Sequence, residues 1–233
     1  MGDLIALEIH TNGPPRPLPP CPYTFPDPRH ADTDGLVAFG GDFDPSTIIA
    51  AYRNGMFPWP HPDEELLWFS PDPRAIIPLD GIHISRRLAR TIRGGRFRLT
   101  LDAAFEEVIR ACAARDEGTW ITPGLIDGYV RLHGAGWAHS FEAWTAGGEL
   151  AGGLYGVGVG SLFGAESMFH RVTDASKVAM VAMMEHARRI GLTLIDVQVI
   201  TPHTARMGAI EIPRSTYLDA LAATLDNDID WRG

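Results

Sequence analysis

The chain has 233 residues, of which 45% are apolar and 21% charged, and its formal net charge is −9. This composition is that of an ordinary globular protein and excludes a disordered chain, a collagen and a disulfide scaffold. The apolar stretches are short and broken by glycine or charge, so none is long enough to span a bilayer. We expect no membrane association, and either one large domain or two small ones.

Two features indicate the compartment. The cysteines are Cys21 and Cys112 alone, and two thiols in a chain of this length favour a reducing environment over a disulfide. Residues 1–10 carry the acidic Asp3 and no basic flank, which does not fit a secretory signal. The expected location is the cytoplasm.

The first 70 residues are rich in proline and aromatic residues. Residues 12–28 carry eight prolines and must run as extended chain over a surface. Asp44 before Pro45 indicates the start of a helix, and Gly55 indicates its end.

Residues 56–60 and 68–74 also combine aromatics with prolines, which predicts rigid loops. We place a domain boundary here, giving an N-terminal domain of residues 1–70 and a second domain of residues 71–233.

The second part alternates between helical and strand patterns. Helices are predicted over 85–94, 102–112, 122–134, 174–190 and 216–225, most of them starting at Ser, Thr or Asp. Strands are predicted over 96–101, 137–145, 150–163 and 192–200, with a hairpin turn at 146–148. This order predicts an α/β or α+β sheet domain.

The strand over 192–200 places polar side chains among apolar ones. Alternation puts Asp196 and Gln198 side by side on one face, with Val197 on the other. A carboxylate and an amide in an apolar strand favour a functional site, although an edge strand with one wet face explains them too. Glu166 stands among apolar neighbours and is equally consistent with a site or with a paired surface acid.

Glycines leave one face of the preceding strand almost bare. Gly152, Gly156, Gly158 and Gly160 share that face. Either a ligand approaches closely there, or the strand is twisted and packs directly on a helix. The order of a nucleotide-binding glycine loop is absent.

The basic residues are unevenly distributed. Lys177 is the sole lysine, and six arginines fall between residues 86 and 98 with no acid among them. Arg86, Arg90 and Arg93 lie on one stripe of a helix, which favours phosphate binding by guanidinium forks over a solvated basic face. The histidines are scattered and no Cys/His cluster occurs, so no metal site is expected.

Short strings in order along the chain resemble one known family, the leucyl/phenylalanyl-tRNA–protein transferases. The strings are Phe39-Gly40-Gly41-Asp42, Gly55-Met56-Phe57-Pro58-Trp59, Trp68-Phe69-Ser70-Pro71-Asp72-Pro73-Arg74, His83-Ile84-Ser85-Arg86, Gly118-Thr119-Trp120-Ile121-Thr122, Ala138-His139-Ser140, Gly152-Gly153-Leu154-Tyr155-Gly156, Glu166-Ser167-Met168-Phe169, Ala175-Ser176-Lys177, Ile195-Asp196-Val197-Gln198 and Gly208-Ala209-Ile210-Glu211-Ile212-Pro213-Arg214. The resemblance covers roughly residues 25–220.

The resemblance implies a bacterial cytoplasmic enzyme that moves Leu or Phe, and less well Met, from aminoacyl-tRNA to the N-terminal Arg or Lys of a protein. That transfer marks the acceptor for degradation by the N-end rule. The implied fold is a small N-terminal domain packed on a domain similar to the GCN5-related N-acetyltransferases. The implied protein is a monomer, with no cofactor and no metal.

The family's residues map by motif onto this chain. The catalytic pair would be Asp196 and Gln198. The residues that hold the aminoacyl end of the tRNA would be Trp59, Trp120, Phe163, Glu166 and Met183. The tRNA-binding patch would be Arg86, Arg90 and Arg93.

The chain departs from the family pattern at three positions. Val197 replaces a cysteine, and the alternation of the strand predicts that it points away from the pair. Ala165 replaces a glycine, which could narrow the pocket, and His170 replaces a serine.

The expected chemistry leaves one choice open. Asp196 would accept a proton from the attacking amine, directly or through Gln198, or else Asp196 or Glu166 would bind the cationic side chain of the acceptor. The alternative functions are an acyl-CoA-dependent N-acetyltransferase and a non-enzymatic RNA-binding module.

Overall fold

The computed structural model describes residues 5–11, 13–60, 65–114 and 118–233. Its strands are β1 (Glu8–Ile9), β2 (Leu36–Phe39), β3 (Phe57–Pro58), β4 (Leu67–Phe69), β5 (Arg74–Ile76), β6 (Arg98–Leu101), β7 (Ala138–Trp144), β8 (Leu150–Val159), β9 (Leu162–His170), β10 (Leu194–Gln198) and β11 (Ile210–Ile212). Its helices are the short 3₁₀ turn η1 (Pro28–His30), α1 (Pro45–Arg53), α2 (Arg86–Arg93), α3 (Phe105–Ala113), α4 (Pro123–Gly134), α5 (Ala175–Ile190), α6 (Pro202–Arg206) and α7 (Arg214–Ala222). Within these ranges the strands form an eight-stranded sheet, β1-β6-β7-β8-β9-β10-β5-β11, and a three-stranded sheet, β2-β4-β3.

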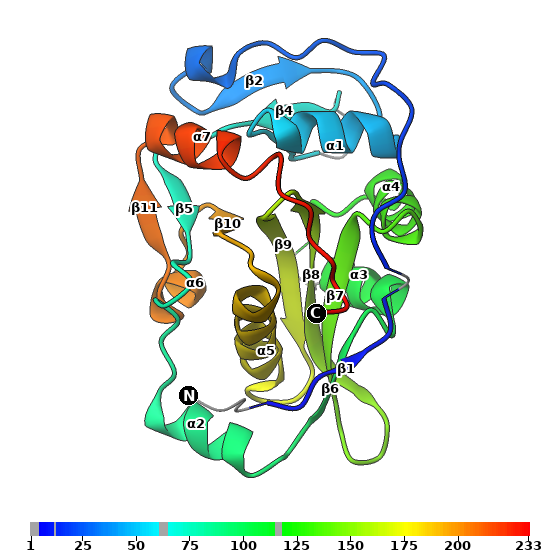
Figure 1. Cartoon of the computed structure of the whole chain (residues 1–233), viewed down its shortest axis with the longest axis vertical. Coiled ribbons are helices and arrows are strands. Elements are labelled where there is room, and N and C mark those ends of the chain that lie inside the picture. Colours follow the sequence, from blue (N-terminus) through cyan, green and yellow to red (C-terminus); the bar gives the residue numbers. More distant parts are fainter. Residues whose placement is uncertain (1–4, 12, 61–64, 115–117) are drawn as a thin grey trace.

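The larger sheet is mixed and has helices on both faces (Figure 1). Strands β9 and β10 run parallel, and most other neighbours are antiparallel. A Cβ added to Gly152 would meet Ala175 of α5 at 2.8 Å, whereas one on Gly153 would meet Val108 of α3 at 3.3 Å. Successive residues of β8 therefore face opposite helical layers, and the predicted α/β class is confirmed.

The smaller sheet lies with α1 and α7 at one end of the larger one (Figure 1). The expectation of loops over 56–60 and 68–74 was wrong in part, because β3, β4 and β5 fall there. Pro58 is tolerated because β3 is the edge strand of its sheet, where a missing N–H costs little. The domain boundary near residue 70 stays a prediction, and β1, which precedes it, pairs with β6 in the larger sheet.

Helices with local capping signals form where the sequence predicts them. Asp44 accepts a hydrogen bond from the N–H of Ser46 (3.0 Å), Ser85 from Leu88 (3.2 Å) and Thr122 from Leu125 (3.3 Å). Residues 13–27 form no helix or strand, as their prolines require, and residue 12 lies outside the described residues. The strand predicted over 150–163 is instead two strands, because Gly160 takes a left-handed φ of 55° and turns the chain.

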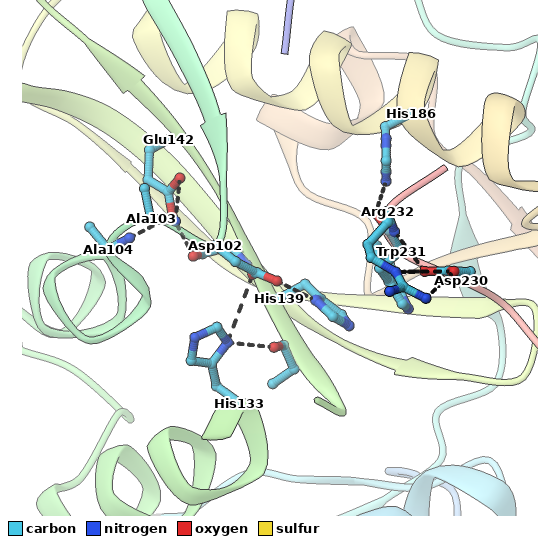
Figure 2. A network of polar contacts seen from close by, with 12 residues as sticks. Asp102, Ala103, Ala104, His133, His139, Glu142, His186, Asp230, Trp231 and Arg232 are labelled. Atoms are coloured by element: carbon cyan, nitrogen blue, oxygen red, sulfur yellow. Dashed lines mark hydrogen bonds and ion pairs between the residues drawn. The ribbon is translucent and has the colours of Figure 1, made fainter. Parts of the chain in front are cut away.

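Asp102 does not cap α3, contrary to the sequence prediction (Figure 2). Its carboxylate bonds His139 Nδ1 at 2.7 Å and the N–H of Ser140 at 2.8 Å. The N–H groups at the start of α3 donate instead to Glu142, on β7. Burial raises the pKa of Glu142 to about 7. Glu142 thus ties β7 to the two residues that lead into α3, and α3 has no side-chain cap.

The C-terminal segment closes the glycine-rich face of β8. Trp231 stacks on His139 with ring centroids 3.9 Å apart, and His186 Nε2 bonds its carbonyl at 3.0 Å (Figure 2). A Cβ on Gly158 would lie 2.7 Å from the Trp231 ring. Trp231 and the start of α5 therefore cover this face, which favours protein packing over ligand access.

Gly160→Ala should lower the free energy of unfolding far more than Gly148→Ala does. Both glycines have a positive φ, which costs an alanine about 1 kcal/mol. A Cβ added at Gly160 would also lie 2.0 Å from the carbonyl oxygen of Thr224, whereas one added at Gly148 would meet nothing within 4 Å. We expect losses of about 3 and about 1 kcal/mol in urea unfolding. Equal losses would show that the contact with Thr224 is unimportant.

Candidate active site

A cavity of about 520 Å³ lies beside the carboxyl end of β10. Its lining residues are Phe57, Pro58, Trp59, Trp120, Leu154, Ala165, Glu166, Ser167, Met168, His170, Ser176, Met180, Val197, Gln198, Val199, Thr201, His203 and Thr204. The volume suits a small-molecule site. The cavity brings together Trp59, Trp120, Glu166 and Gln198, four of the residues proposed from the sequence.

Aromatic rings form one wall of the cavity. Trp59 lies 6.3 Å from Trp120 and 6.2 Å from Phe69, measured between ring centroids. Both tryptophans are half-buried, so each presents part of its ring to the cavity. Such a wall can stack a nucleobase or hold an apolar side chain.

Phe163 and Met183 lie behind the cavity wall, in the hydrophobic core. Both are fully buried, and neither lines the cavity. The ring of Phe163 packs between Phe141 and Trp231, with centroids at 6.2 and 5.4 Å. Their role in substrate binding stays a prediction, and in this structure they support the wall from behind.

Asp196 is fully buried and paired with Arg74 (1% exposed). The guanidinium donates from Nε to Oδ1 at 2.9 Å and from Nη2 to Oδ2 at 2.6 Å. Tyr217 donates its hydroxyl to Oδ2 at 2.9 Å, and the N–H of Gln198 donates to Oδ1 at 2.9 Å. Four donors therefore hold the carboxylate, which is not among the residues lining the cavity.

Arg74 is held as firmly as its partner. Its Nη1 donates to the carbonyl of Gly55 at 3.1 Å, and its guanidinium lies 4.3 Å from the centre of the Tyr217 ring. Burial is the strongest single influence and opposes its charge, but the charge and hydrogen bonds of Asp196, together with Tyr217 and Tyr52, outweigh burial and raise the pKa of Arg74. The arginine stays charged and neutralises Asp196.

Gln198 connects this ion pair to the cavity. Its φ of 59° lies in the left-handed region, and the pairing of β10 with β5 is irregular between Asp196 and Gln198. Its side-chain amide therefore turns toward β9 and donates to Glu166 Oε1 at 2.8 Å. The regular alternation is broken, and Val197, expected to point away, lines the cavity.

Glu166 is the acidic residue that lines the cavity. Burial raises its pKa from an ordinary 4.5 to about 8, although hydrogen bonds from Tyr52 and Gln198 act in the opposite direction. The hydroxyls of Tyr52 and Tyr129 lie 3.0 Å apart. A carboxyl group with such a pKa can hold or release a proton near neutral pH.

The arginines of α2 form a separate, exposed patch. Arg86, Arg90 and Arg93 are exposed, and no ion pair is found for them among the described residues. Arg87, on the same helix, pairs with Asp174 at 3.4 Å. The patch is not part of the cavity wall.

The residues that organise the site could not be recognised from the sequence pattern. Arg74, Tyr217 and Tyr52 were assigned no role. Arg74 ends one of the strings that carry the family resemblance, but its partner lies 122 residues away. The sequence offered one hint of this pairing. Arg74 is a basic residue that follows a proline-rich stretch, and Asp196 is an acid on an apolar strand that needs a partner.

Other classes of site find no support in the part of the chain that is described. There, no group of three His, Cys, Asp or Glu side chains could hold a metal ion. No helix in the same ranges has the length and apolar character needed to cross a membrane.

Comparisons with known proteins show the family to which the chain belongs. The family model described as leucyl/phenylalanyl-tRNA protein transferase matches residues 76–222, and the model of that family's N-terminal domain matches residues 41–72. A transferase of this name from Anaeromyxobacter sp. (strain Fw109-5) is 54% identical over 207 residues, covering 87% of this chain and 88% of the relative.

Two further comparisons concern another relative of the same name and a solved structure. A relative of the same name from Proteus mirabilis (strain HI4320) is 51% identical and covers 85% of this chain and 87% of its own. The solved structure of L-PGS from Bacillus licheniformis has a TM-score of 0.38 at 16% identity, over 56% of this chain and 47% of that one.

The family model and the two relatives of that name make the protein an aminoacyltransferase. The chain belongs to the leucyl/phenylalanyl-tRNA–protein transferase family.

Removing one member of the buried ion pair should destabilise the fold strongly. We expect Arg74→Leu and Asp196→Leu each to lower the free energy of unfolding by about 3–5 kcal/mol, because each leaves an unpaired buried charge. The loss in free energy of unfolding should be smaller for the double variant than the sum of the two single losses, because neither charge remains buried. Denaturant unfolding of all four proteins measures the coupling, and strictly additive losses would contradict it.

The raised pKa of Glu166 should make the stability of the fold depend on pH. Between about 4.5 and 8 the folded protein keeps a proton that the unfolded chain has lost. The free energy of unfolding contributed by this group therefore falls as pH rises through that interval. Glu166→Gln, which resembles the protonated form, should flatten the decline measured by unfolding between pH 5 and 8.

The control is Glu149→Gln, on the exposed hairpin. It should leave the pH dependence of the wild type unchanged. If Glu166→Gln keeps the full decline, Glu166 is ionised in the folded protein.

Proposed function

We propose that this protein transfers Leu or Phe, and less well Met, from aminoacyl-tRNA to the N-terminal Arg or Lys of acceptor proteins. In this proposal the product is a substrate of N-end-rule degradation, and the enzyme acts as a monomer in the bacterial cytoplasm. The observation that carries the proposal is the cavity itself. It combines an aromatic wall with a carboxyl and an amide group in a chain of this family.

The donor end of the tRNA would occupy the cavity. Trp59 and Trp120 offer ring faces to the terminal adenosine. The aminoacyl group would lie toward Glu166, with Phe163 and Met183 supporting the wall behind it and with the methyl of Ala165 limiting its space. The patch of Arg86, Arg90 and Arg93 would bind the tRNA backbone outside the cavity.

The reaction exchanges an ester for an amide. The acceptor's amine attacks the ester carbonyl, the C–N bond forms, and the bond to the 3′ oxygen of the tRNA breaks. The amine loses a proton and the 3′ hydroxyl gains one. An α-amine with a pKa of roughly 7.7–8.0 is partly neutral at pH 7, so the enzyme gains most by holding amine and ester in attack geometry.

Asp196 and Gln198 would act as a unit in this step. Asp196 is held by Arg74 and fixes the backbone of Gln198, whose amide reaches the cavity. The contacts favour action of Asp196 through Gln198 over direct contact with the amine. Glu166 would bind the amine of the acceptor or the cation that follows it.

The test is transfer of labelled Leu and Phe from their tRNAs to a protein with N-terminal Arg, against the same protein with N-terminal Gly. We expect label on the Arg acceptor alone, and none after RNase treatment. Gln198→Ala should reduce turnover by about 10- to 100-fold with little change in tRNA affinity, because it disturbs attack geometry and not the outer contacts.

A control variant and a competitor sharpen this result. Asn54→Ala removes an exposed amide that bonds only its own helix, and it should transfer at the wild-type rate. Coenzyme A in excess should not compete. Absence of transfer from either tRNA, or full turnover by Gln198→Ala, would contradict the proposal.

A further inference from the structure

Basic residues stand at one end of the cavity, and the proposed transfer gives them no role. His170 at the end of β9 and His203 in α6 both line this end. Lys177 in the first turn of α5 and Arg206 in α6 stand nearby. We refer to these four residues as the basic rim.

The four residues form one electrostatic cluster. The pKa of His203 is lowered first by its burial and then by Lys177, Arg206 and His170. His170 and His203 line one cavity, and Arg206 stands on the same helix as His203. Asp174 pairs with Lys177, and no ion pair is found for the other three bases among the described residues.

His203 has an open hydrogen-bonding position in this cluster. Among the described residues, its buried Nε2 has no hydrogen-bond partner. The helix that carries it is fixed by a reciprocal cap, in which Thr201 accepts from the N–H of Thr204 at 3.1 Å and Thr204 accepts from that of Thr201 at 2.9 Å. Because both threonines also line the cavity, His203 is oriented in advance by its wall.

An ion-pair bridge links the basic rim to the arginine helix. Asp174, directly before α5, lies 3.7 Å from Lys177 Nζ and 3.4 Å from Arg87 Nε. Arg87 belongs to α2, which also carries Arg86, Arg90 and Arg93. The carboxylate of Asp174 therefore holds the start of α5 next to α2, and so places the exposed arginine patch beside the basic rim.

The other end of the cavity carries the opposite chemistry. Glu166 and the amide of Gln198 lie there, bonded to each other at 2.8 Å. The cavity is polarised, with bases toward α6 and a carboxyl group at the centre of β9. An anionic group is therefore favoured at the rim and not beside Glu166, whose carboxyl group would repel an anion when ionised.

We propose that His170, Lys177, His203 and Arg206 bind the backbone phosphate that precedes the terminal adenosine of the aminoacyl-tRNA. This inference rests on the proposed function and names the part of the donor that the rim receives. It fixes the direction of the donor, with the phosphate at α6 and the ester toward Gln198. The rim repels a cationic acceptor, which therefore approaches on the side of Glu166.

The experiment measures binding of two non-reactive donor analogues by calorimetry. Both are phenylalanyl-adenosines with a 3′ amide in place of the ester, and one carries a 5′ phosphate. We expect the phosphate to tighten binding to the wild type about tenfold, the gain typical of a charge-assisted hydrogen bond. The double variant Lys177→Met/Arg206→Gln should bind both analogues equally.

The matched control carries the same loss of charge elsewhere. Arg53→Gln/Arg188→Gln replaces two exposed arginines in the last turns of α1 and α5. It should keep the full tenfold preference, and circular dichroism should show that both double variants are folded. A preference lost equally in the control would mean that only the overall charge matters.

Two outcomes would overturn the proposal. The 5′ phosphate could give the wild type no advantage, or the rim variant could keep that advantage. Inorganic phosphate as competitor separates the sources, since it should displace the phosphorylated analogue only weakly. The calorimetry measures binding without turnover. A failure of transfer from tRNA would therefore count against the proposed function, but it would not change the measured preference for the 5′ phosphate.

Discussion

The site depends on the buried ion pair between Arg74 and Asp196. Moving two charges out of water costs several kcal/mol each unless every donor and acceptor is satisfied. Here Asp196 receives four hydrogen bonds, and Arg74 also bonds the carbonyl of Gly55. The pair joins β5 to β10, and Tyr217 adds α7. The ion pair and the Tyr217 hydrogen bond thereby hold β5, β10 and α7 together.

The hydrogen-bonded ion pair explains the left-handed backbone conformation of Gln198. A left-handed φ is costly for a residue with a side chain and persists only where its surroundings enforce it. The hydrogen bond from the N–H of Gln198 to Asp196 supplies that restraint. The side-chain amide can then meet Glu166 on the neighbouring strand. In the proposed reaction, the ion pair is therefore a positioning device for the amide, and the cavity is where the chemistry occurs.

The sequence predicted local features well and long-range pairings poorly. The helices beginning after Asp44, Ser85 and Thr122 were found because each cap lies within three residues of its partner. Asp102 carried the same signal but pairs with His139, and α3 begins without a side-chain cap. Nothing local reveals such a pairing.

The candidate site shows the same limit. Its motifs pointed to Asp196, Gln198 and Glu166, which stand in two of the strings, and both strings reach the cavity. Strict alternation put Asp196 and Gln198 on one face, yet the bulge in β10 separates them. The burial of Phe163 and the pairing of Arg74 arise from packing between distant elements, which no pattern of spacing contains.

The electrostatics of the cavity suit an attack by an amine. Glu166, with a pKa of about 8, closely matches an α-amine at roughly 7.7–8.0. Near pH 7 most of the Glu166 carboxyl is therefore protonated and neutral, so it does not hold the amine in its charged form. A fully ionised carboxylate would hold the ammonium form as an ion pair and slow the attack. Asp196 is paired with Arg74, and burial raises the pKa of Glu166. A buried Glu166 therefore suits the proposed transfer better than a fully ionised carboxylate at the same position would.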